Sequence, residues 1–290
     1  MALGDSLTEG VGDPVPGGWR GWAALLAPSL SPEPVDFRNL ANSGALSRDL
    51  LVSQLPTALA VRPQYAGVVV GGNDTLRASF DIELTARHYA AVLSSLTAAG
   101  TVPLTACLPD PGTLLGLPAP LARPLARRMR SVNAVVHALS DHYHARHVHL
   151  ADLPWTQKRS LLSVDRLHPS ASGHQLIACA FHSLLAEAGH PVGDPPAELP
   201  ASEPGRAANL WWMATQGTRW VAARSTDLLP GLFALAFLEA RHLLRGTTRR
   251  LDRTDAHTTA AIIARLTAPG PDHHLPAHPT DSPTGTPTAH

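Results

Sequence analysis

Four short, separated segments carry side chains that together could perform nucleophilic catalysis. Ser6 lies in the turn-forming sequence GDSLTEG, and Asp165 and His168 lie three residues apart in DRLHPS. A serine hydroxyl becomes an effective nucleophile when a neighbouring base takes its proton and a third group orients that base. The spacing lets the Asp165 carboxylate accept a hydrogen bond from His168 Nδ1, which leaves Nε2 to face Ser6. We therefore predict Ser6 as the nucleophile, His168 as the base and Asp165 as the group that orients it.

The other two segments could donate the hydrogen bonds that acyl transfer needs. Attack on an ester carbonyl creates an oxyanion, which preorganised N–H groups stabilise. Asn73 follows an apolar run in GGND, and Gly44 lies in NSGA, where no side chain blocks its backbone N–H. Together with the N–H of Ser6, these residues predict an oxyanion hole of Ser6, Gly44 and Asn73. Asp5 and Asp74 are assigned structural roles.

Each segment alone also has an ordinary structural interpretation. Gly-Asp-Ser is common in turns, and Asn73 with Asp74 could form an Asx turn. His168 could be a loop residue before a proline, and Asp165 a surface acid. The joint occurrence of all four segments favours catalysis over these readings.

In order and intervals, the four segments resemble those of the SGNH (GDSL) hydrolases, over about residues 1–189. The resemblance implies a flavodoxin-like α/β fold and an esterase, lipase, thioesterase or carbohydrate deacetylase activity. It implies the same roles for the triad and oxyanion residues named above. The chain departs from the family pattern at its start, where only Met1–Leu3 precede the GDS turn.

Elements that could position these residues alternate regularly up to residue 189. Short apolar runs predict strands at 1–4, 35–41, 65–72, 101–108 and 147–152. Longer amphipathic stretches predict helices at 19–30, 47–55, 81–100, 123–143 and 170–189. Such alternation predicts a parallel sheet with helices on both faces, a three-layer α/β sandwich. Ligands bind beyond the carboxyl ends of such strands.

The remainder of the chain differs in composition. We expect a Pro-rich linker at 190–208, an apolar helical extension at 209–246 and a mostly disordered tail at 247–290. Within the extension, Asp227 could cap a helix from Leu228 to Arg245. Its apolar core of 11 residues is shorter than the roughly 20 that span a bilayer. Three uses remain open: packing on residues 1–189, which is favoured, dimerisation, or contact with a membrane surface.

Composition narrows the classes of ligand. The chain has 23 basic and 23 acidic residues and no basic stripe, which argues against a nucleic-acid partner. Two cysteines, at 107 and 179, lie in apolar runs and predict buried thiols. The His-rich sequence HYHARHVH, residues 142–149, could bind a metal but has no acid at ligand spacing. We interpret it as solvated surface and expect neither metal nor organic cofactor.

The predicted activity is that of a serine esterase or lipase-type acyl hydrolase that acts on a small-molecule or lipid acyl ester through an acyl-enzyme. A deacetylase, thioesterase or acyltransferase would use the same residues. A catalytically silent binding module is the alternative from another class. No basic and apolar export signal precedes the first strand, so we expect a cytoplasmic protein. A late start assignment that removed such a signal is the alternative.

Overall fold

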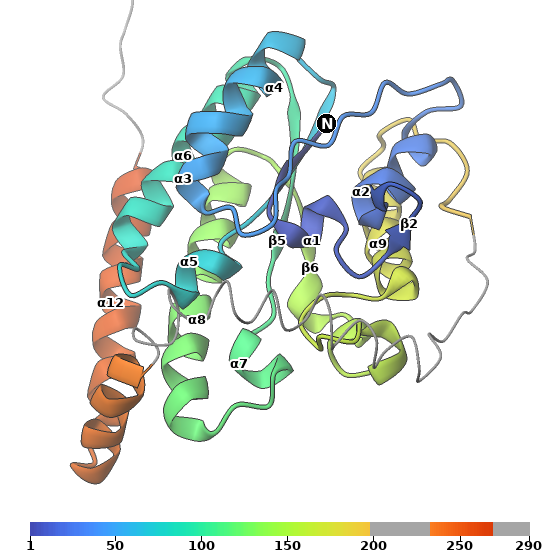
Figure 1. The fold of residues 1–290 in the computed structure, drawn as a ribbon. Coiled ribbons are helices and arrows are strands. Elements are labelled where there is room, and N and C mark those ends of the chain that lie inside the picture. Colours follow the sequence, from blue (N-terminus) through green and yellow to red (C-terminus); the bar gives the residue numbers. More distant parts are fainter. Residues whose placement is uncertain (198–232, 269–290) are drawn as a thin grey trace, which may run out of the picture.

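A parallel sheet forms the centre of the computed structural model, which describes residues 1–197 and 233–268 (Figure 1). Its four strands are β1 (Ala2–Gly4), β4 (Tyr65–Val69), β5 (Val102–Cys107) and β6 (Arg146–His149). They pair in the order β1-β4-β5-β6, and every neighbouring pair is parallel. The predicted α/β fold with a parallel sheet is therefore confirmed.

Helices cover both faces of this sheet and complete three layers (Figure 1). One face carries α2 (Gly21–Leu26) and α9 (Ala171–Glu187). The opposite face carries α6 (Ile82–Ala98) and α8 (Ala119–His142). On the first face, the buried rings of Trp22 and Phe181 stack with centroids 4.7 Å apart. The apolar faces predicted from the helical periodicity thus form the core.

Short elements follow the carboxyl ends of the strands and surround the sheet. After β1, β4 and β5 come α1 (Ser6–Glu9), α5 (Gly72–Leu76) and α7 (Pro111–Leu114). A small antiparallel pair consists of β2 (Pro14–Val15) and β3 (Gly18–Trp19). The predicted helix at 47–55 is longer than expected, because α3 (Ser47–Asp49) continues through a π-helical turn (Leu50–Gln54) into α4 (Leu55–Val61).

The prediction of a full strand at 35–41 is wrong. Only Asn39 forms a β-bridge, to Ala2. The segment runs along the outer edge of β1, where Ala2 N donates to Arg38 O at 2.9 Å and Leu40 N donates to Ala2 O at 2.8 Å. Because β1 has three residues, it offers too few partners for a longer ladder, and most of the segment stays exposed.

The tail predicted as mostly disordered contains a well-packed helix, α12 (Thr248–Leu266). It lies against α6 and α8 as an additional outer helix (Figure 1). Ile262 is 2% exposed, and Thr259 Oγ1 donates to Ser131 Oγ at 2.9 Å. The narrow apolar stripe of α12 is hidden in a sequence rich in Thr, Arg and Asp, so composition alone is misleading there. The rest of the tail, 269–290, lies outside the described residues.

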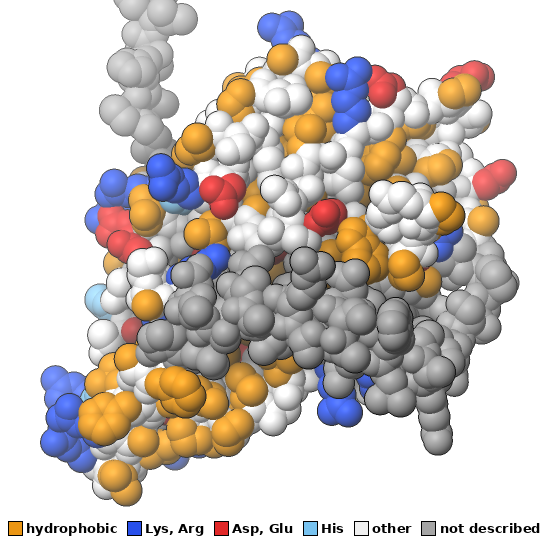
Figure 2. Space-filling model, in the orientation of Figure 1, with side chains coloured by type: hydrophobic (Ala, Val, Ile, Leu, Met, Phe, Trp, Pro, Cys, Tyr) orange, Lys and Arg blue, Asp and Glu red, His pale blue; other side chains and the backbone are white. Residues whose placement is uncertain are grey.

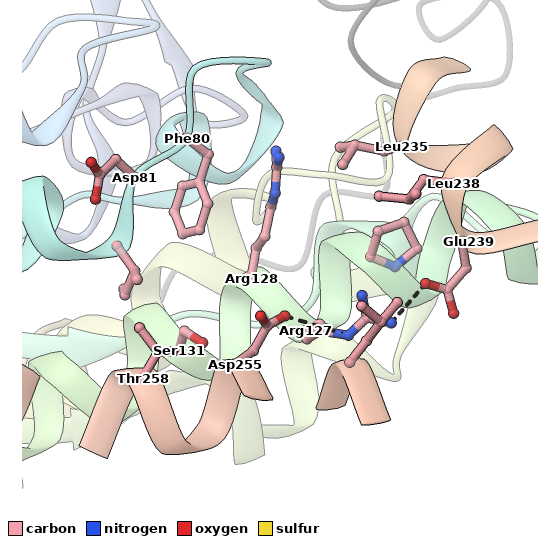
Figure 3. Close-up of a pocket in the computed structure, with 13 residues that line it drawn as sticks. Phe80, Asp81, Arg127, Arg128, Ser131, Leu235, Leu238, Glu239, Asp255 and Thr258 are labelled. Carbon is pink, nitrogen blue, oxygen red and sulfur yellow. Dashed lines mark hydrogen bonds and ion pairs between the residues drawn. The ribbon is translucent and has the colours of Figure 1, made fainter. Parts of the chain in front are cut away.

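The C-terminal helices join the α/β layers through a buried ionic contact at Arg127 of α8. Its guanidinium donates to Glu239 Oε2 at 2.7 Å and to Asp252 Oδ1 at 2.8 Å. Asp252 lies on α12, and Glu239 lies on the helix at 233–244, the described part of the predicted extension. Figure 3 shows Glu239 and Asp255 approaching Arg127 from different sides in a cavity of about 420 Å³.

Apolar side chains remain exposed on the helix at 233–244. Phe233, Phe237 and Leu244 are 64%, 67% and 89% exposed, and Figure 2 shows hydrophobic side chains gathered on this part of the surface. None of the described helices has the length and apolar character that crossing a membrane would require. The capped helix predicted from Asp227 begins outside the described residues, and dimerisation or membrane contact through 209–246 stays a prediction.

Removing the Arg127 charge tests the ionic contact. We expect Arg127→Met to lower the free energy of unfolding by about 3–5 kcal/mol, because Glu239 would remain buried without its partner. Arg130→Met is the matched control: its side chain is 64% exposed and lies 3.5 Å from Asp252, so its loss should cost at most about 1 kcal/mol. Urea unfolding followed by circular dichroism measures both. Equal effects of the two substitutions would contradict a structural role for the buried charge.

Candidate active site

Ser6 is held at the carboxyl end of β1, as the first residue of α1. Asp5 caps this helix, and its Oδ1 accepts the N–H of Leu7 at 3.1 Å. Burial raises the pKa of Asp5 to about 6. Asp74, the other acid assigned a structural role, accepts the Ser47 hydroxyl at 2.7 Å and ties α5 to α3.

The structure brings together the three residues predicted to form a triad. His168 Nε2 lies 2.7 Å from Ser6 Oγ, although the two residues are 162 positions apart. His168 Nδ1 lies 2.6 Å from Asp165 Oδ2. A tautomer with the proton on Nδ1 donates to Asp165 and leaves Nε2 free to accept from the Ser6 hydroxyl. A serine hydroxyl, an imidazole and a carboxylate in this order are the geometry that proton removal from a serine nucleophile requires.

The environment of Asp165 keeps it ionised. Burial alone would raise its pKa, but the hydrogen bond and charge of His168 outweigh this effect. The N–H groups of Leu167 and His168 also donate to Asp165 Oδ1, at 2.9 and 3.0 Å. The net result is a pKa below the ordinary value of an aspartate, so the carboxylate is available to orient the imidazole at neutral pH.

Backbone hydrogen bonds hold the loop that carries His168. Ser163 N donates to His168 O at 2.8 Å, and Ser170 N donates to Leu161 O at 2.9 Å. An antiparallel bridge pairs Leu162 with Pro169. The loop therefore has its own short ladder, directly before α9, and the position of the imidazole does not depend on side-chain contacts alone.

Asn73 lines the same pocket as Ser6 and His168. Its Nδ2 lies 3.2 Å from Asp5 Oδ2 and 3.2 Å from Ala45 O. Both contacts are longer than the usual 2.9–3.0 Å of an N–H···O bond. The carboxamide is thus placed beside the serine, with its N–H groups in two long hydrogen bonds.

Gly44 lies in the loop between the edge segment and α3. Its φ of 85° is in the left-handed region, where a glycine is favoured. The loop is tied to β1 by Asn42 N, which donates to Gly4 O at 3.2 Å. Among the described residues, neither the Gly44 N–H nor the Ser6 N–H has a hydrogen-bond acceptor. Gly44 is not among the residues that line the pocket.

Sequence analysis missed a positioning residue, Gln54. Its Oε1 accepts the N–H of Gly4 at 2.8 Å, and its Nε2 donates to Gly4 O at 2.9 Å. A side chain on Gly4 would clash, because a Cβ there would lie 2.4 Å from Val69 O. The buried carboxamide therefore pairs with the backbone two residues before Ser6. A single glutamine on an amphipathic helix gives no signal of this role.

An apolar pocket of about 70 Å³ opens beside Ser6 and His168. Besides polar residues, it is lined by Leu7, Leu76, Leu108, Pro109, Pro111, Leu114, Met129, Trp155 and Leu167. Most of these residues come from the segments that follow β5 and β6. The pocket offers a small apolar space next to the Ser6 hydroxyl.

Solved structures with the same fold include several esterases. An acetylxylan esterase, Axe2 from Geobacillus stearothermophilus, is 20% identical, with a TM-score of 0.50 over 63% of this chain and 92% of that one. The psychrotrophic esterase EstA from Pseudoalteromonas sp. is 19% identical, with a TM-score of 0.50 over 64% and 96%. A putative lipolytic G-D-S-L protein from Desulfitobacterium hafniense is 20% identical, with a TM-score of 0.51 over 63% and 97%. At these identities the likeness shows the fold.

Sequence comparison identifies the family. Curated protein sequences gave no significant match. A family model, by contrast, matches residues 2–176, a range that includes Ser6, Gly44, Asn73 and the Asp165–His168 pair. The chain belongs to the GDSL-like lipase/acylhydrolase family, and so to a family of hydrolases.

Proposed function

We propose that this protein is a serine esterase that hydrolyses carboxylic esters of small molecules through an acyl-enzyme on Ser6. The observation that carries the proposal is the continuous hydrogen-bonded chain from Asp165 through His168 to Ser6, with distances of 2.6 and 2.7 Å. This chain lies at the mouth of an apolar pocket.

The geometry supports a two-step reaction. Ser6 Oγ attacks the carbonyl carbon while His168 Nε2 takes the hydroxyl proton, and Asp165 stabilises the resulting imidazolium. The tetrahedral intermediate then collapses: the bond to the alcohol oxygen breaks, and His168 returns the proton to that oxygen. In the second step, water attacks the acyl-enzyme with His168 as base, and the carboxylic acid leaves Ser6.

The oxyanion would accept hydrogen bonds from the backbone N–H groups of Ser6 and Gly44 and from Asn73 Nδ2. In the resting arrangement the Asn73 carboxamide makes two long contacts, each at 3.2 Å, to the Asp5 carboxylate and to the Ala45 carbonyl. Hydrogen bonds to a charged oxygen are shorter and roughly twice as strong as neutral ones. An oxyanion in the pocket would therefore replace the contact to the neutral Ala45 carbonyl, and stabilisation would be gained in the transition state.

The small volume of the pocket favours short acyl groups such as acetate. Long fatty acyl chains need an extended groove, and about 70 Å³ with walls such as Leu108 and Leu114 provides little room. The fold is shared with an acetylxylan esterase, which is consistent with a small acyl group. Deacetylation of a carbohydrate ester is therefore the second candidate, with the same residues in the same roles. Residues 1–189 would form the hydrolase domain.

Covalent labelling tests the nucleophile. A fluorophosphonate probe should label the wild-type protein and fail to label Ser6→Ala, because the phosphonyl group bonds only to an activated hydroxyl. Ser53→Ala, which removes an exposed serine, should label like the wild type. Intact-mass spectrometry measures the adduct. A folded wild-type protein without an adduct would favour the silent binding module.

Loss of Asn73 tests the oxyanion donor. We expect Asn73→Ala to lower kcat about 100- to 1000-fold with little change in KM, because the donor acts mainly in the transition state. Asn42→Ala, at an exposed position of the Gly44 loop, should keep kcat within about threefold of wild type. Steady-state hydrolysis of nitrophenyl acetate gives both constants. If Asn73→Ala lowered kcat by less than tenfold, the result would count against Asn73 as an oxyanion donor.

A series of nitrophenyl esters tests the acyl preference. We expect kcat/KM to be highest for acetate or propionate and to fall as the acyl chain lengthens. Leu114→Ala should move the optimum toward longer chains, because Leu114 lines the pocket. Leu115→Ala is the control, because Leu115 is next to Leu114 in the chain but is 38% exposed and does not line the pocket. A rise in kcat/KM with chain length in the wild type would indicate a lipase-like groove.

A further inference from the structure

One cysteine and three histidines converge on the side of β5 and β6 that faces α8, outside the catalytic triad. They are Cys107 at the end of β5, His147 and His149 on β6, and His137 on α8. Taking one ligand atom from each residue, all four atoms lie within 4.8 Å of one another. Cysteine sulfur and imidazole nitrogen are the donors that zinc prefers in proteins.

The fold itself produces this convergence. In the register of the two parallel strands, Thr105 pairs with His147 and Cys107 pairs with His149. Residues two apart on a strand point to the same face, so all four side chains share one face of the sheet. Thr105 Oγ1 lies 2.7 Å from Ser140 Oγ of α8, which shows that α8 covers this face.

His137 reaches the same place from α8. It lies three residues, and therefore about one helical turn, before Ser140. Its ring centroid is 4.3 Å from that of His147 and 4.7 Å from that of His149, and the last two are 5.1 Å apart. Three imidazoles are thus gathered around one point, with the buried thiol of Cys107 beside them.

The orientation of the His147 ring provides independent support. Its Nδ1 lies 3.0 Å from Thr105 Oγ1 and 3.4 Å from Ser140 Oγ. Its Nε2 is buried and has no hydrogen-bond partner among the described residues. In metal sites, a hydrogen bond to the second nitrogen of a ligating histidine fixes the ring. Here two hydroxyls hold Nδ1, and the buried Nε2 is left available as a ligand atom.

We propose that Cys107, His137, His147 and His149 bind one Zn²⁺ ion in a four-coordinate site. A site with four protein ligands is closed to substrate and is of the structural kind. Zinc–nitrogen and zinc–sulfur bonds of about 2.0–2.3 Å place tetrahedral ligand atoms roughly 3.3–3.6 Å apart. The exposed His149 and the half-buried His137 have room to close that difference. On binding, Cys107 releases its thiol proton to solvent and coordinates as thiolate.

The site would stabilise the part of the sheet that shapes the catalytic pocket. It joins the last strand, β6, to β5 and α8. The residue after Cys107 is Leu108, which lines the pocket. The residue after His149 is Leu150, whose carbonyl accepts Trp155 Nε1 at 3.0 Å, and Trp155 also lines the pocket. Zinc would fix the starting points of both loops without touching the reacting atoms.

This proposal revises the interpretation of HYHARHVH as solvated surface. Two of its four histidines, His147 and His149, belong to the cluster, whereas His142 and His144 do not. The other two ligands lie 10 and 40 residues before His147, so no local spacing motif connects them. Only the strand register and the α8 contact bring them together.

Metal binding is tested on the full chain, reduced and stripped with EDTA. Titration with Co²⁺ should saturate at one ion per chain and produce a thiolate-to-cobalt charge-transfer absorption, which Zn²⁺ then abolishes. Excess Zn²⁺ at about 100 times Kd should raise Tm by about 5–10 °C relative to the EDTA-treated protein. A folded, reduced wild type that takes up less than stoichiometric metal would overturn the proposal.

Paired variants locate the site. His149→Ala should raise the Kd for Zn²⁺ at least tenfold, and Cys107→Ser should abolish the charge-transfer band. The matched controls His142→Ala, at an exposed histidine of the same segment, and Cys179→Ser, at the other free cysteine, should bind as the wild type does. Circular dichroism confirms that each variant is folded. Equal zinc affinity of His149→Ala and His142→Ala would place the metal elsewhere and refute the site.

Discussion

The site depends on how a strand of only three residues, β1, holds the backbone that leads into Ser6. Both backbone groups of Gly4 are hydrogen-bonded to the Gln54 carboxamide, and Gly4 O also accepts from Asn42 N. On its other side β1 pairs with β4. A strand this short would fray if it were open on one side, because few ladder bonds oppose the loss of backbone freedom. Here partners on both sides, together with a buried side chain, replace the missing length.

Ser6 and His168 come from opposite ends of the family-matching region, so the fold must hold these two distant segments together. The packing of α2 against α9 does this. The fully buried His174 of α9 accepts Trp22 N at 3.2 Å through Nδ1 and lies 3.0 Å from Val11 O through Nε2. Burial lowers the pKa of His174 to about 4, so it remains neutral and can bridge the two segments. The chain that follows Ser6 and the helix that follows His168 are therefore joined directly.

The sequence was most informative where chemistry and local structure coincide. The proximity of Ser6, Asp165 and His168 could be predicted because their segments occur together in one order and at fixed intervals, although each segment alone is ambiguous. Parallel strands such as β4 and β5 could be predicted from apolar runs bounded by turns. The full strand at 35–41 was an error, because pattern analysis does not count the partners that a neighbouring strand can offer. The role of Gln54 and the clustering of Cys107 with three histidines could not be predicted, because both depend on contacts between residues far apart in the sequence.

The Arg127 contact has a consequence for the minimal folding unit. The family match ends at residue 176, yet α8 inside that region places a nearly buried guanidinium against acids from beyond it. A fragment that ends at residue 176 would leave this guanidinium exposed to solvent. The surface of α6 and α8 against which α12 packs would be exposed as well. The outer helices thus supply contacts to α8 that such a fragment would lack. The residues that the family model matches therefore do not include all the residues that complete the buried contacts of α8.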